Sequence, residues 1–276
     1  RKSAAGYDLT RLFVGSEGTL GVITEITLRL YGIPEAISSA VCTFPDLDSA
    51  VATVISTIQY GIPVARIELL DEAQVDAINR YSKTDLAVAP TLFLEFHGSS
   101  RGVEEQAQVV QELAGDSGGS NFQWTTNTEE RNRLWQARHD AAYACKALRP
   151  DGEIWATDVC VPISQLAECI RETQHDIRES NLVAPIVGHV GDGNFHLVLL
   201  VDKNDPEEHE RAQQLHERMV MRALAMGGTC TGEHGIGYGK LDFLVAEHGE
   251  AVSVMRAIKQ ALDPNNIMNP GKILRV

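Results

Sequence analysis

The sequence predicts an α+β fold in which short strands alternate with amphipathic helices. From Ala40 onward, apolar runs of strand length are separated by segments whose apolar residues recur at helical spacing. An Asp-Gly pair at residues 192–193 lies between two apolar runs, which is a strong signal for a β-hairpin. The chain has 276 residues, 43% of them hydrophobic, so it can bury a core as one large domain or two modest ones.

The N-terminal stretch has a different pattern from the rest of the chain. Residues 12–30 combine a short apolar run, a loop and the alternating run 22–28, so we expect strand, tight loop and strand. The loop contains Gly15, Gly18 and Gly21. Pro34 follows, and the pattern changes after it, which predicts a domain boundary near residue 35. Because the chain starts at Arg1 in what resembles a domain interior, we expect a fragment.

The remaining elements follow from periodicity and from capping residues. Thr126 with Glu129 forms a capping-box pattern, and Asp205 with Pro206 predicts a helix start. The last helix should end at Asp263, before an irregular tail. The expected strands are 40–45, 62–70, 90–97, 121–125, 155–161, 183–189 and 195–201, and the expected helices are 47–59, 71–80, 102–114, 127–147, 163–178, 206–226 and 249–262.

Charge and cysteine content exclude several classes of protein. A net charge of -14 disfavours nucleic acid as a partner, because such binding needs clustered Lys and Arg. The five cysteines form no CxxC pair, so neither a disulfide framework nor a thiolate zinc site is expected, and a reducing compartment fits best. No apolar run approaches the roughly 20 residues of a membrane span, so no transmembrane segment is expected.

The segment 186–199 predicts a metal site on a hairpin. If Asp192 and Gly193 are the two turn residues, counting outward places His189 directly opposite His196. Directly opposed side chains lie about 4.5–5.5 Å apart at Cβ, from where two imidazoles can reach one ion. Asn194 shares their face by the period of two. A structural hairpin without metal is the competing interpretation.

A second cluster, Gly232–Gly237, places Glu233 and His234 among glycines, which allow close approach of the backbone to a ligand. Two histidines and one carboxylate leave coordination positions open, as catalytic metal sites do. The ligand types alone leave the chemistry open, and a flavin-free Fe(II) oxygenase or metal-assisted hydrolase would use the same set. A non-catalytic cap or interaction module is the other alternative.

Seven segments together resemble the FAD-linked oxidases of the vanillyl-alcohol oxidase type, from one end of the chain to the other. The resemblance is strongest to the branch of cytochrome-linked D-lactate dehydrogenases, with glycolate oxidases and D-2-hydroxyglutarate dehydrogenases as near relatives. GHVGDGNFH with GEHGIG is specific in combination. The segments are LFVGSEGTLGVITEITLRL (12–30), RIELLDE (66–72), PTLFLEFHGS (90–99), TDVCVPIS (157–164), GHVGDGNFH (188–196), GTCTGEHGIG (228–237) and MNPGK (268–272).

This resemblance implies a domain organisation and a flavin site. Residues 1–35 would be the C-terminal end of an FAD-binding domain, 36–248 a ferredoxin-like cap domain with a largely antiparallel sheet covered by helices, and 249–276 a helix and tail that return to the flavin. The family's N-terminal half, with its pyrophosphate loop, is absent from this chain. The FAD-contacting candidates are Ser16, Gly18, Thr19, Gly21, Ile23 and Asn269.

The resemblance also implies roles in oxidation of a D-2-hydroxy acid. His189, His196 and Glu233 would hold a divalent ion, zinc or manganese, and His234 would take the hydroxyl proton. Arg138 would clamp the substrate carboxylate, although a solvated helix face is its ordinary interpretation. Asn194 is a further catalytic candidate. Trp135 and Phe195 are expected to be core residues.

Substrate, acceptor and location complete the expectations. D-2-hydroxyglutarate dehydrogenases carry a lysine two positions before the aspartate that matches Asp158, and here that position is Ala156. A second carboxylate would therefore lack a partner, which favours D-lactate, with glycolate next. Electrons would pass to a cytochrome, a quinone or an electron-transfer flavoprotein. We expect a cytoplasmic protein, or one peripheral to the inner membrane and mitochondrial in a eukaryote, and a homodimer remains open.

Overall fold

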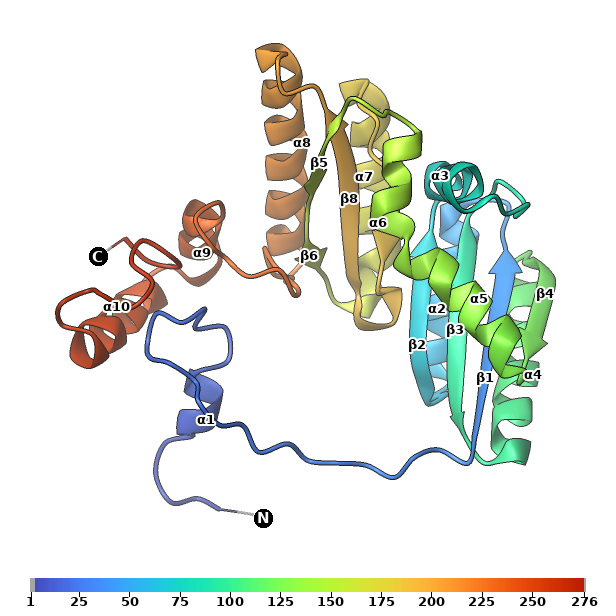
Figure 1. Ribbon diagram of the computed structural model, residues 1–276, viewed down its shortest axis with the longest axis horizontal. Helices are drawn as coiled ribbons and strands as arrows, with labels where there is room; N and C mark the ends of the chain where they lie inside the picture. The colour runs from blue at the N-terminus through green and yellow to red at the C-terminus, as the bar shows by residue number, and fades with distance from the viewer. Residues whose placement is uncertain (1–2, 276) are drawn as a thin grey trace. The chain divides into compact units, whose positions relative to one another are not determined.

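The computed structural model describes residues 3–275, which form two compact units (Figure 1). Unit 1 consists of Arg1–Tyr31 and Thr229–Val276, and unit 2 of Gly32–Gly228. The first boundary lies close to the one expected from the sequence. The second division between units falls between residues 228 and 229, whereas the family resemblance implies a domain boundary between 248 and 249, which stays a prediction.

Unit 2 contains a sheet whose strands pair antiparallel throughout the described residues. The strand order is β4-β1-β3-β2-β7-β8-β5, and β6 also pairs with β8 (Figure 1). The strands are β1 (Ala36–Thr43), β2 (Val64–Leu70), β3 (Thr91–Gly98), β4 (Ser120–Thr125), β5 (Glu153–Ala156), β6 (Val159–Cys160), β7 (Ile186–Gly188) and β8 (Asn194–Val201).

Helices cover both faces of this sheet. On one face α2 (Leu47–Gln59) packs between α4 (Ser100–Asp116) and α7 (Leu166–Ser180), and α7 packs against α8 (Pro206–Ala225). The other face carries the shorter helices, whose side chains form one core cluster with those of the strands. These helices are α3 (Glu72–Ser82), α5 (Thr128–His139), α6 (Ala141–Ala144) and the 3-10 turn Cys145–Ala147.

The first half of unit 2 confirms the ferredoxin-like expectation. The elements β1, α2, β2, β3, α4 and β4 follow one another with α3 inserted between β2 and β3, and their strands lie in the order β4-β1-β3-β2. This is the βαββαβ arrangement. Its core includes Phe93 and Trp135, whose rings lie 6.4 Å apart, and the second half buries Phe195 completely. Both aromatic residues that were expected in the core are therefore there.

Helix ends agree with local signals in most places. Asp205 caps α8 through the backbone N–H groups of residues 207 and 208, with Pro206 in the first turn. The expected capping box at Thr126 is wrong, because the cap of α5 is Asn127, whose side-chain oxygen accepts from residues 129 and 130. The expected helix 127–147 is also broken at Asp140 into α5, α6 and a 3-10 turn.

Unit 1 contains only helices and loops among its described residues. They are α1 (Leu9–Leu12), α9 (Leu241–His248) and α10 (Ala251–Leu262). The expectation of strands in 12–14 and 22–28 is wrong: helix α1 ends at Leu12, and 22–28 has no assigned structure. A strand needs a neighbour to satisfy its backbone, and the described part of unit 1 contains no strand to pair with.

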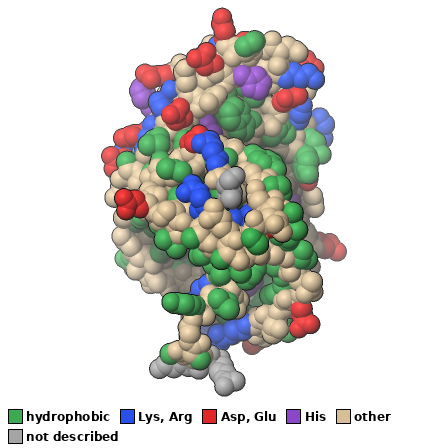
Figure 2. Space-filling view, turned by 90° about the vertical axis from the view of Figure 1, so that its left-hand side faces the viewer, with side chains coloured by type: hydrophobic (Ala, Val, Ile, Leu, Met, Phe, Trp, Pro, Cys, Tyr) green, Lys and Arg blue, Asp and Glu red, His purple; other side chains and the backbone are tan. Residues whose placement is uncertain are grey.

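Hydrophobic side chains are exposed at the surface of unit 1. Val22, Ile26 and Leu28, which alternate in the sequence as strand residues do, are 76%, 68% and 72% exposed. Hydrophobic side chains are also visible across the face shown in Figure 2, with Lys and Arg side chains among them. None of the helices in the described residues 3–275 has both the length and the apolar character required to cross a membrane.

Candidate functional site

The hairpin β7–β8 forms, but its turn is longer than expected. Asp192 and Gly193 donate backbone N–H groups to the carbonyls of His189 and Val190 in a 3-10 turn, and Gly193 alone of these has a positive φ, +80°. The predicted two-residue turn would need positive φ at both central residues. The predicted register is therefore wrong, because His196 faces Val187 rather than His189.

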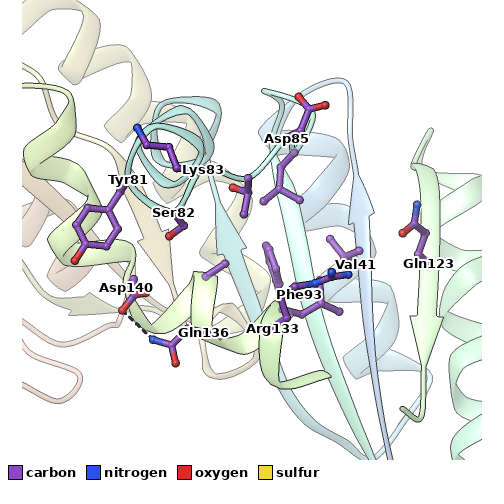
Figure 3. A pocket seen from close by; sticks show the side chains of 14 residues that line it. Val41, Tyr81, Ser82, Lys83, Asp85, Phe93, Gln123, Arg133, Gln136 and Asp140 are labelled. Carbon is purple, nitrogen blue, oxygen red and sulfur yellow. Dashed lines mark hydrogen bonds between the residues drawn. The ribbon is translucent and has the colours of Figure 1, made fainter. Parts of the chain in front are cut away.

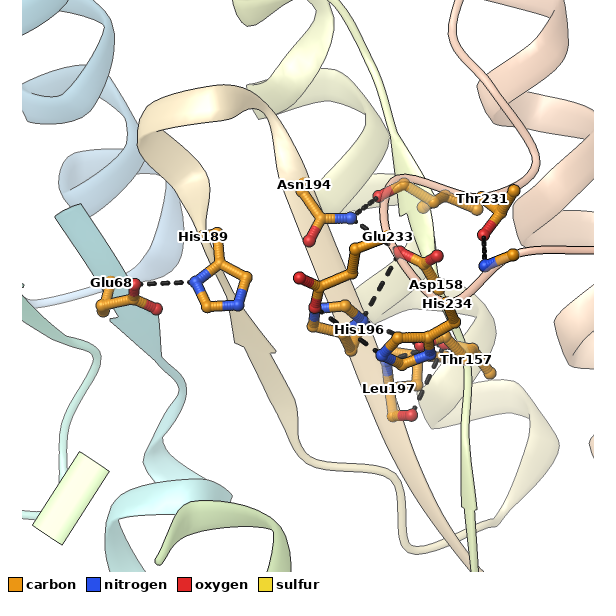
Figure 4. Close-up of polar contacts among 12 residues, drawn as sticks. Glu68, Thr157, Asp158, His189, Asn194, His196, Leu197, Thr231, Glu233 and His234 are labelled. Atoms are coloured by element: carbon orange, nitrogen blue, oxygen red, sulfur yellow. Dashed lines mark hydrogen bonds and ion pairs between the residues drawn. The ribbon is translucent and has the colours of Figure 1, made fainter. Parts of the chain in front are cut away.

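The two imidazoles nevertheless lie close together. The centroids of the His189 and His196 rings are 5.8 Å apart, with an angle of 85° between the ring planes. The true register differs from the predicted one by two residues, and a shift of two keeps side chains on the same face of a strand. The face was therefore correct although the pairing was not, and both histidines lie on one side of the hairpin (Figure 4).

His196 is held by the segment between β5 and β6, on the side of β8 opposite β7. Its Nδ1 lies 2.9 Å from the carbonyl oxygen of Thr157, and the hydroxyl of Thr157 accepts from the backbone N–H of Leu197 at 2.8 Å. The hydroxyl thus takes the place in the ladder that the carbonyl would otherwise fill. This substitution accounts for the break between β5 and β6, since the register is the same on both sides of it, with Ala156 opposite Val198 and Val159 opposite Phe195.

Asp158 and Asn194 are buried beside His196 and are hydrogen-bonded to each other. The Asn194 amide donates to Asp158 Oδ1 at 2.7 Å and to the Val159 carbonyl at 2.8 Å. Asp158 is fully buried, and its Oδ1 lies 3.7 Å from His196 Nδ1. Asn194 is therefore a fixed group with both N–H donors in use, and it orders the strand that carries His196.

His189 is held by a carboxylate from β2. Its Nδ1 lies 2.7 Å from Glu68 Oε1 (Figure 4). The other carboxylate oxygen of Glu68 accepts from Arg138 Nε at 3.1 Å and Nη2 at 2.7 Å. Arg138 projects from α5, whose Trp135 packs on the core face. The structure thus places the predicted clamp arginine beside a predicted metal ligand, with Glu68 between them.

Unit 2 contains several cavities. One of about 250 Å³ opens beside the hairpin turn, between β2 and residues 189–192, and is lined by Arg66, Glu68, His189 and Asp192 among others. A larger one, about 720 Å³, lies between α5 and the segment 81–86, which comprises the end of α3 and the residues that follow it (Figure 3). Its lining contains none of the predicted site residues.

Unit 1 brings together the glycine loop, the Glu-His segment and the C-terminal asparagine. The Glu17 carboxylate accepts from the backbone N–H groups of Ile236 at 2.7 Å and Gly237 at 3.0 Å. The Asn269 amide donates to the Glu17 carbonyl oxygen. A Cβ at Gly235, whose φ is +82°, would lie 2.6 Å from the Glu17 carboxylate, so glycine is required for this approach.

The predicted FAD-contacting residues of unit 1 differ in their burial and contacts. Gly18 lies next to Asn269, and Thr19 is buried, its backbone carbonyl accepting from Lys259 at 2.8 Å. Ser16 is also buried, and its carbonyl accepts from the Thr19 hydroxyl. Gly21 packs near Phe13. Ile23 differs, since it lies on the extended segment and is 55% exposed.

Glu233 and His234 belong to unit 1, whereas His189, His196, Asn194 and Arg138 belong to unit 2. Within unit 1 the His234 Nε2 lies 3.6 Å from the Glu233 carboxylate, and both side chains are partly exposed. Sequence reasoning missed Glu68, Thr157 and Glu17. Glu68 could have been noticed from the sequence, because it is an acid within the apolar strand segment 67–70. Acids are rarely buried unless they are paired, so a partner for Glu68 was to be expected.

The chain belongs to the family described as FAD linked oxidases, C-terminal domain, which matches residues 33–273. This confirms the resemblance seen in the sequence.

The relatives include D-lactate dehydrogenases and a glycolate oxidase subunit. A probable mitochondrial D-lactate dehydrogenase of Danio rerio is 56% identical over 277 residues, covering 100% of this chain and 56% of that protein. The mitochondrial D-lactate dehydrogenase [cytochrome] 1 of Saccharomyces cerevisiae is 44% identical, covering 100% of this chain and 48% of that protein. The glycolate oxidase subunit GlcD of Bacillus subtilis is 34% identical, covering 99% of this chain and 58% of that protein. The chain spans about half the length of these relatives.

A solved structure agrees on the fold. The 4-ethylphenol oxidase of Gulosibacter chungangensis superposes with a TM-score of 0.68 at 16% identity, covering 89% of this chain and 55% of that protein.

Proposed function

We propose that this chain supplies the cap domain of an FAD- and metal-dependent dehydrogenase that oxidises a D-2-hydroxy acid, with D-lactate as substrate. The observation that carries the proposal is the pair of adjacent imidazoles, His189 and His196, each with its Nδ1 bonded to an oxygen acceptor. The names of the relatives, D-lactate dehydrogenase and glycolate oxidase, support the substrate class.

The donor set fits a divalent ion. Oxygen acceptors at Nδ1 select the tautomer that carries its hydrogen there and its lone pair on Nε2, and metal-binding histidines are commonly held in this way. We propose Glu233 as the third ligand because of its residue type and its glycine-rich setting. Two imidazoles and one carboxylate suit zinc or manganese and leave positions for the substrate.

The chemistry divides between the bound groups and this chain. When bound, the divalent ion supplies Lewis-acid stabilisation of the hydroxyl oxygen, and FAD supplies the hydride acceptor. Arg138 would bind the substrate carboxylate, since Glu68 accepts two of its five N–H groups and three are left over. His234 would take the hydroxyl proton. Ser16, Gly18, Thr19, Gly21, Ile23 and Asn269 would face the flavin.

The exposed alternating segment 22–28 supports a role for residues 1–35 as the end of the FAD-binding domain. Its hydrophobic side chains would be covered by the rest of that domain, which also holds the pyrophosphate loop. We therefore expect the 276-residue chain alone to bind FAD weakly or not at all. A stoichiometric flavin spectrum of this chain by itself would contradict that expectation.

The substrate proposal rests on Ala156, at the end of β5, where the family resemblance implies a lysine in D-2-hydroxyglutarate dehydrogenases. With no cation at this position, a second substrate carboxylate bound there would have no positively charged partner. The test is a panel of D-2-hydroxy acids on the full-length protein. D-lactate should show the highest kcat/KM, and a comparable value for D-2-hydroxyglutarate would refute the assignment.

Cofactor content of the full-length protein tests the class of reaction. We expect one flavin by absorbance and one divalent ion by metal analysis. A metal-containing preparation without flavin would favour a flavin-free metalloenzyme, and metal without turnover of any hydroxy acid would favour a binding module. A cytochrome is the acceptor we propose, with a mitochondrial location in a eukaryote. Quinone and an electron-transfer flavoprotein are the other acceptors to assay.

The roles of the histidines are separable. His189→Ala and His196→Ala should each lose the metal, and with it both substrate binding and rate. His234→Ala should keep the metal and much of the substrate affinity but lose rate by about 10²–10⁴-fold, the usual contribution of a general base. Loss of metal in His234→Ala would defeat this division of roles.

A further inference from the structure

Glu68 stands out in unit 2 as a buried acid between two functional groups. Its side chain is 6% exposed and lies on β2, opposite Phe93 of β3. Burial of a carboxylate is costly unless the charge is paired and both oxygens accept hydrogen bonds. Each of its two oxygens is directed at a different residue that the proposed function uses.

The contacts are short. Glu68 Oε1 lies 2.7 Å from His189 Nδ1, and Glu68 Oε2 accepts from Arg138 Nε at 3.1 Å and Nη2 at 2.7 Å. The Arg138 side chain is itself 15% exposed, so this ion pair is largely removed from water. All three residues lie within unit 2, on β2, α5 and the turn after β7.

We propose that Glu68 is a positioning residue that couples the metal ligand His189 to the substrate clamp Arg138. The inference rests on the proposed function and adds a link between its two parts. Through Oε1, Glu68 holds the hydrogen on Nδ1 of His189 and so presents Nε2 to the ion. Through Oε2, it fixes the plane of the Arg138 guanidinium that receives the substrate carboxylate.

Glutamine cannot replace Glu68 in both roles. Its amide has one oxygen acceptor and one NH₂ donor, whereas the site presents donors on both sides. If the oxygen faces Arg138, the NH₂ group faces His189 Nδ1 and selects the tautomer with hydrogen on Nε2. If the oxygen faces His189, the NH₂ group points at the guanidinium, which has no acceptor. Glu68→Gln therefore impairs either metal binding or the clamp.

Glu95 provides a matched control on the neighbouring strand. It is also 6% exposed, and it also joins an arginine to a histidine: Arg66 Nη2 at 2.9 Å and His97 Nε2 at 2.9 Å. Neither of these partners is a proposed ligand or clamp. Glu95→Gln thus removes a buried carboxylate with similar partners from the same sheet without touching the proposed metal ligand.

The experiment measures affinity for Mn²⁺ and Zn²⁺ by competition with a chromophoric chelator, in the full-length protein after removal of bound metal. If its amide oxygen faces Arg138, Glu68→Gln should bind either ion about 10–100-fold more weakly than wild type, the usual effect of losing a partner of a metal-bound histidine. If the oxygen faces His189 instead, metal affinity should be kept and KM for D-lactate should rise. Glu95→Gln should bind like wild type. Glu68→Asp, which keeps the charge but is shorter, should fall between wild type and Glu68→Gln.

The remaining outcomes are distinct. Equal affinities of wild type and Glu68→Gln, with KM for D-lactate unchanged, would overturn the coupling while leaving the proposed function intact. Equal losses in Glu68→Gln and Glu95→Gln would also overturn it, because they would indicate a general loss of structure. A wild-type protein that binds neither ion would refute the metal-dependent function itself. If Glu68→Gln does not fold, Glu68→Asp compared with Glu95→Asp decides the question.

Discussion

Gly188→Ala should disrupt the hairpin that carries both histidines. Gly188 ends β7, one residue before His189, and packs directly on β8. A Cβ at this position would lie 2.6 Å from the carbonyl oxygen of Asn194, 2.7 Å from Phe195 Cβ and 2.8 Å from Phe195 Cα. Two of these three atoms belong to the backbone, so no side-chain rotation can relieve the contact.

The size of the effect follows from these distances. The neighbouring atoms would have to move by roughly 0.7–0.9 Å to reach an ordinary contact of about 3.5 Å. Overpacking of a well-ordered core costs about 1–3 kcal/mol, and contacts with backbone place this variant near the upper value. With a urea m-value of about 2–3 kcal/mol/M, a loss of about 3 kcal/mol lowers the unfolding midpoint by roughly 1–1.5 M.

Tryptophan fluorescence during urea unfolding is a suitable assay, because the chain's three tryptophans, Trp124, Trp135 and Trp155, all lie in unit 2. Gly191→Ala, in the same hairpin, is the control. Its Cβ would be 3.6 Å from the nearest atom, on Ile67, and its φ is not positive, so its midpoint should stay near that of wild type. A Gly188→Ala midpoint within about 0.2 M of the control would refute the packing argument.

Three further predictions concern charge and burial. Burial raises the pKa of the Asp71 carboxyl to about 7, above its unfolded value. Wild type should therefore lose stability as the pH rises from 5 to 8, and Asp71→Asn should lose less; urea unfolding midpoints at each pH measure both. Iodoacetamide should label Cys160 before the buried cysteines, although slowly, because burial raises the pKa of its thiol; peptide mass spectrometry checks the order. Lys259→Met leaves buried Asp263 without its cation and should lower the melting temperature, with Lys272→Met, at a half-buried position, as control.

Local signals predicted much of the fold. Helix α2 has the bounds expected from its apolar periodicity, and α8 begins after the expected Asp205 cap. The ferredoxin-like order and the family were both predicted and confirmed. These features depend on residues that are close in sequence or on motifs quoted whole, so pattern reasoning could reach them.

Only part of the candidate site could be predicted from such local patterns. The residue types were read directly from the sequence. The shared face of His189 and His196 followed from the period of two in a strand, and it survived because the register was wrong by two residues, which keeps side chains on the same face. Their acceptors did not follow, because Glu68 lies 121 residues from His189 and Thr157 lies 39 residues from His196. The register itself depends on the 3-10 turn and on the contact of Gly188 with β8, which no local pattern indicates.

The sequence by itself determined which side chains can do chemistry and which segments alternate between helix and strand, because both depend on residue type and spacing. Tertiary structure decided which oxygen holds each imidazole and whether an apolar alternating segment becomes a strand. The segment 22–28 shows the reason: it has the period of a strand, but a strand exists only where a neighbour accepts and donates its backbone hydrogen bonds. In unit 2 the sheet provides those neighbours, and in the described part of unit 1 nothing does.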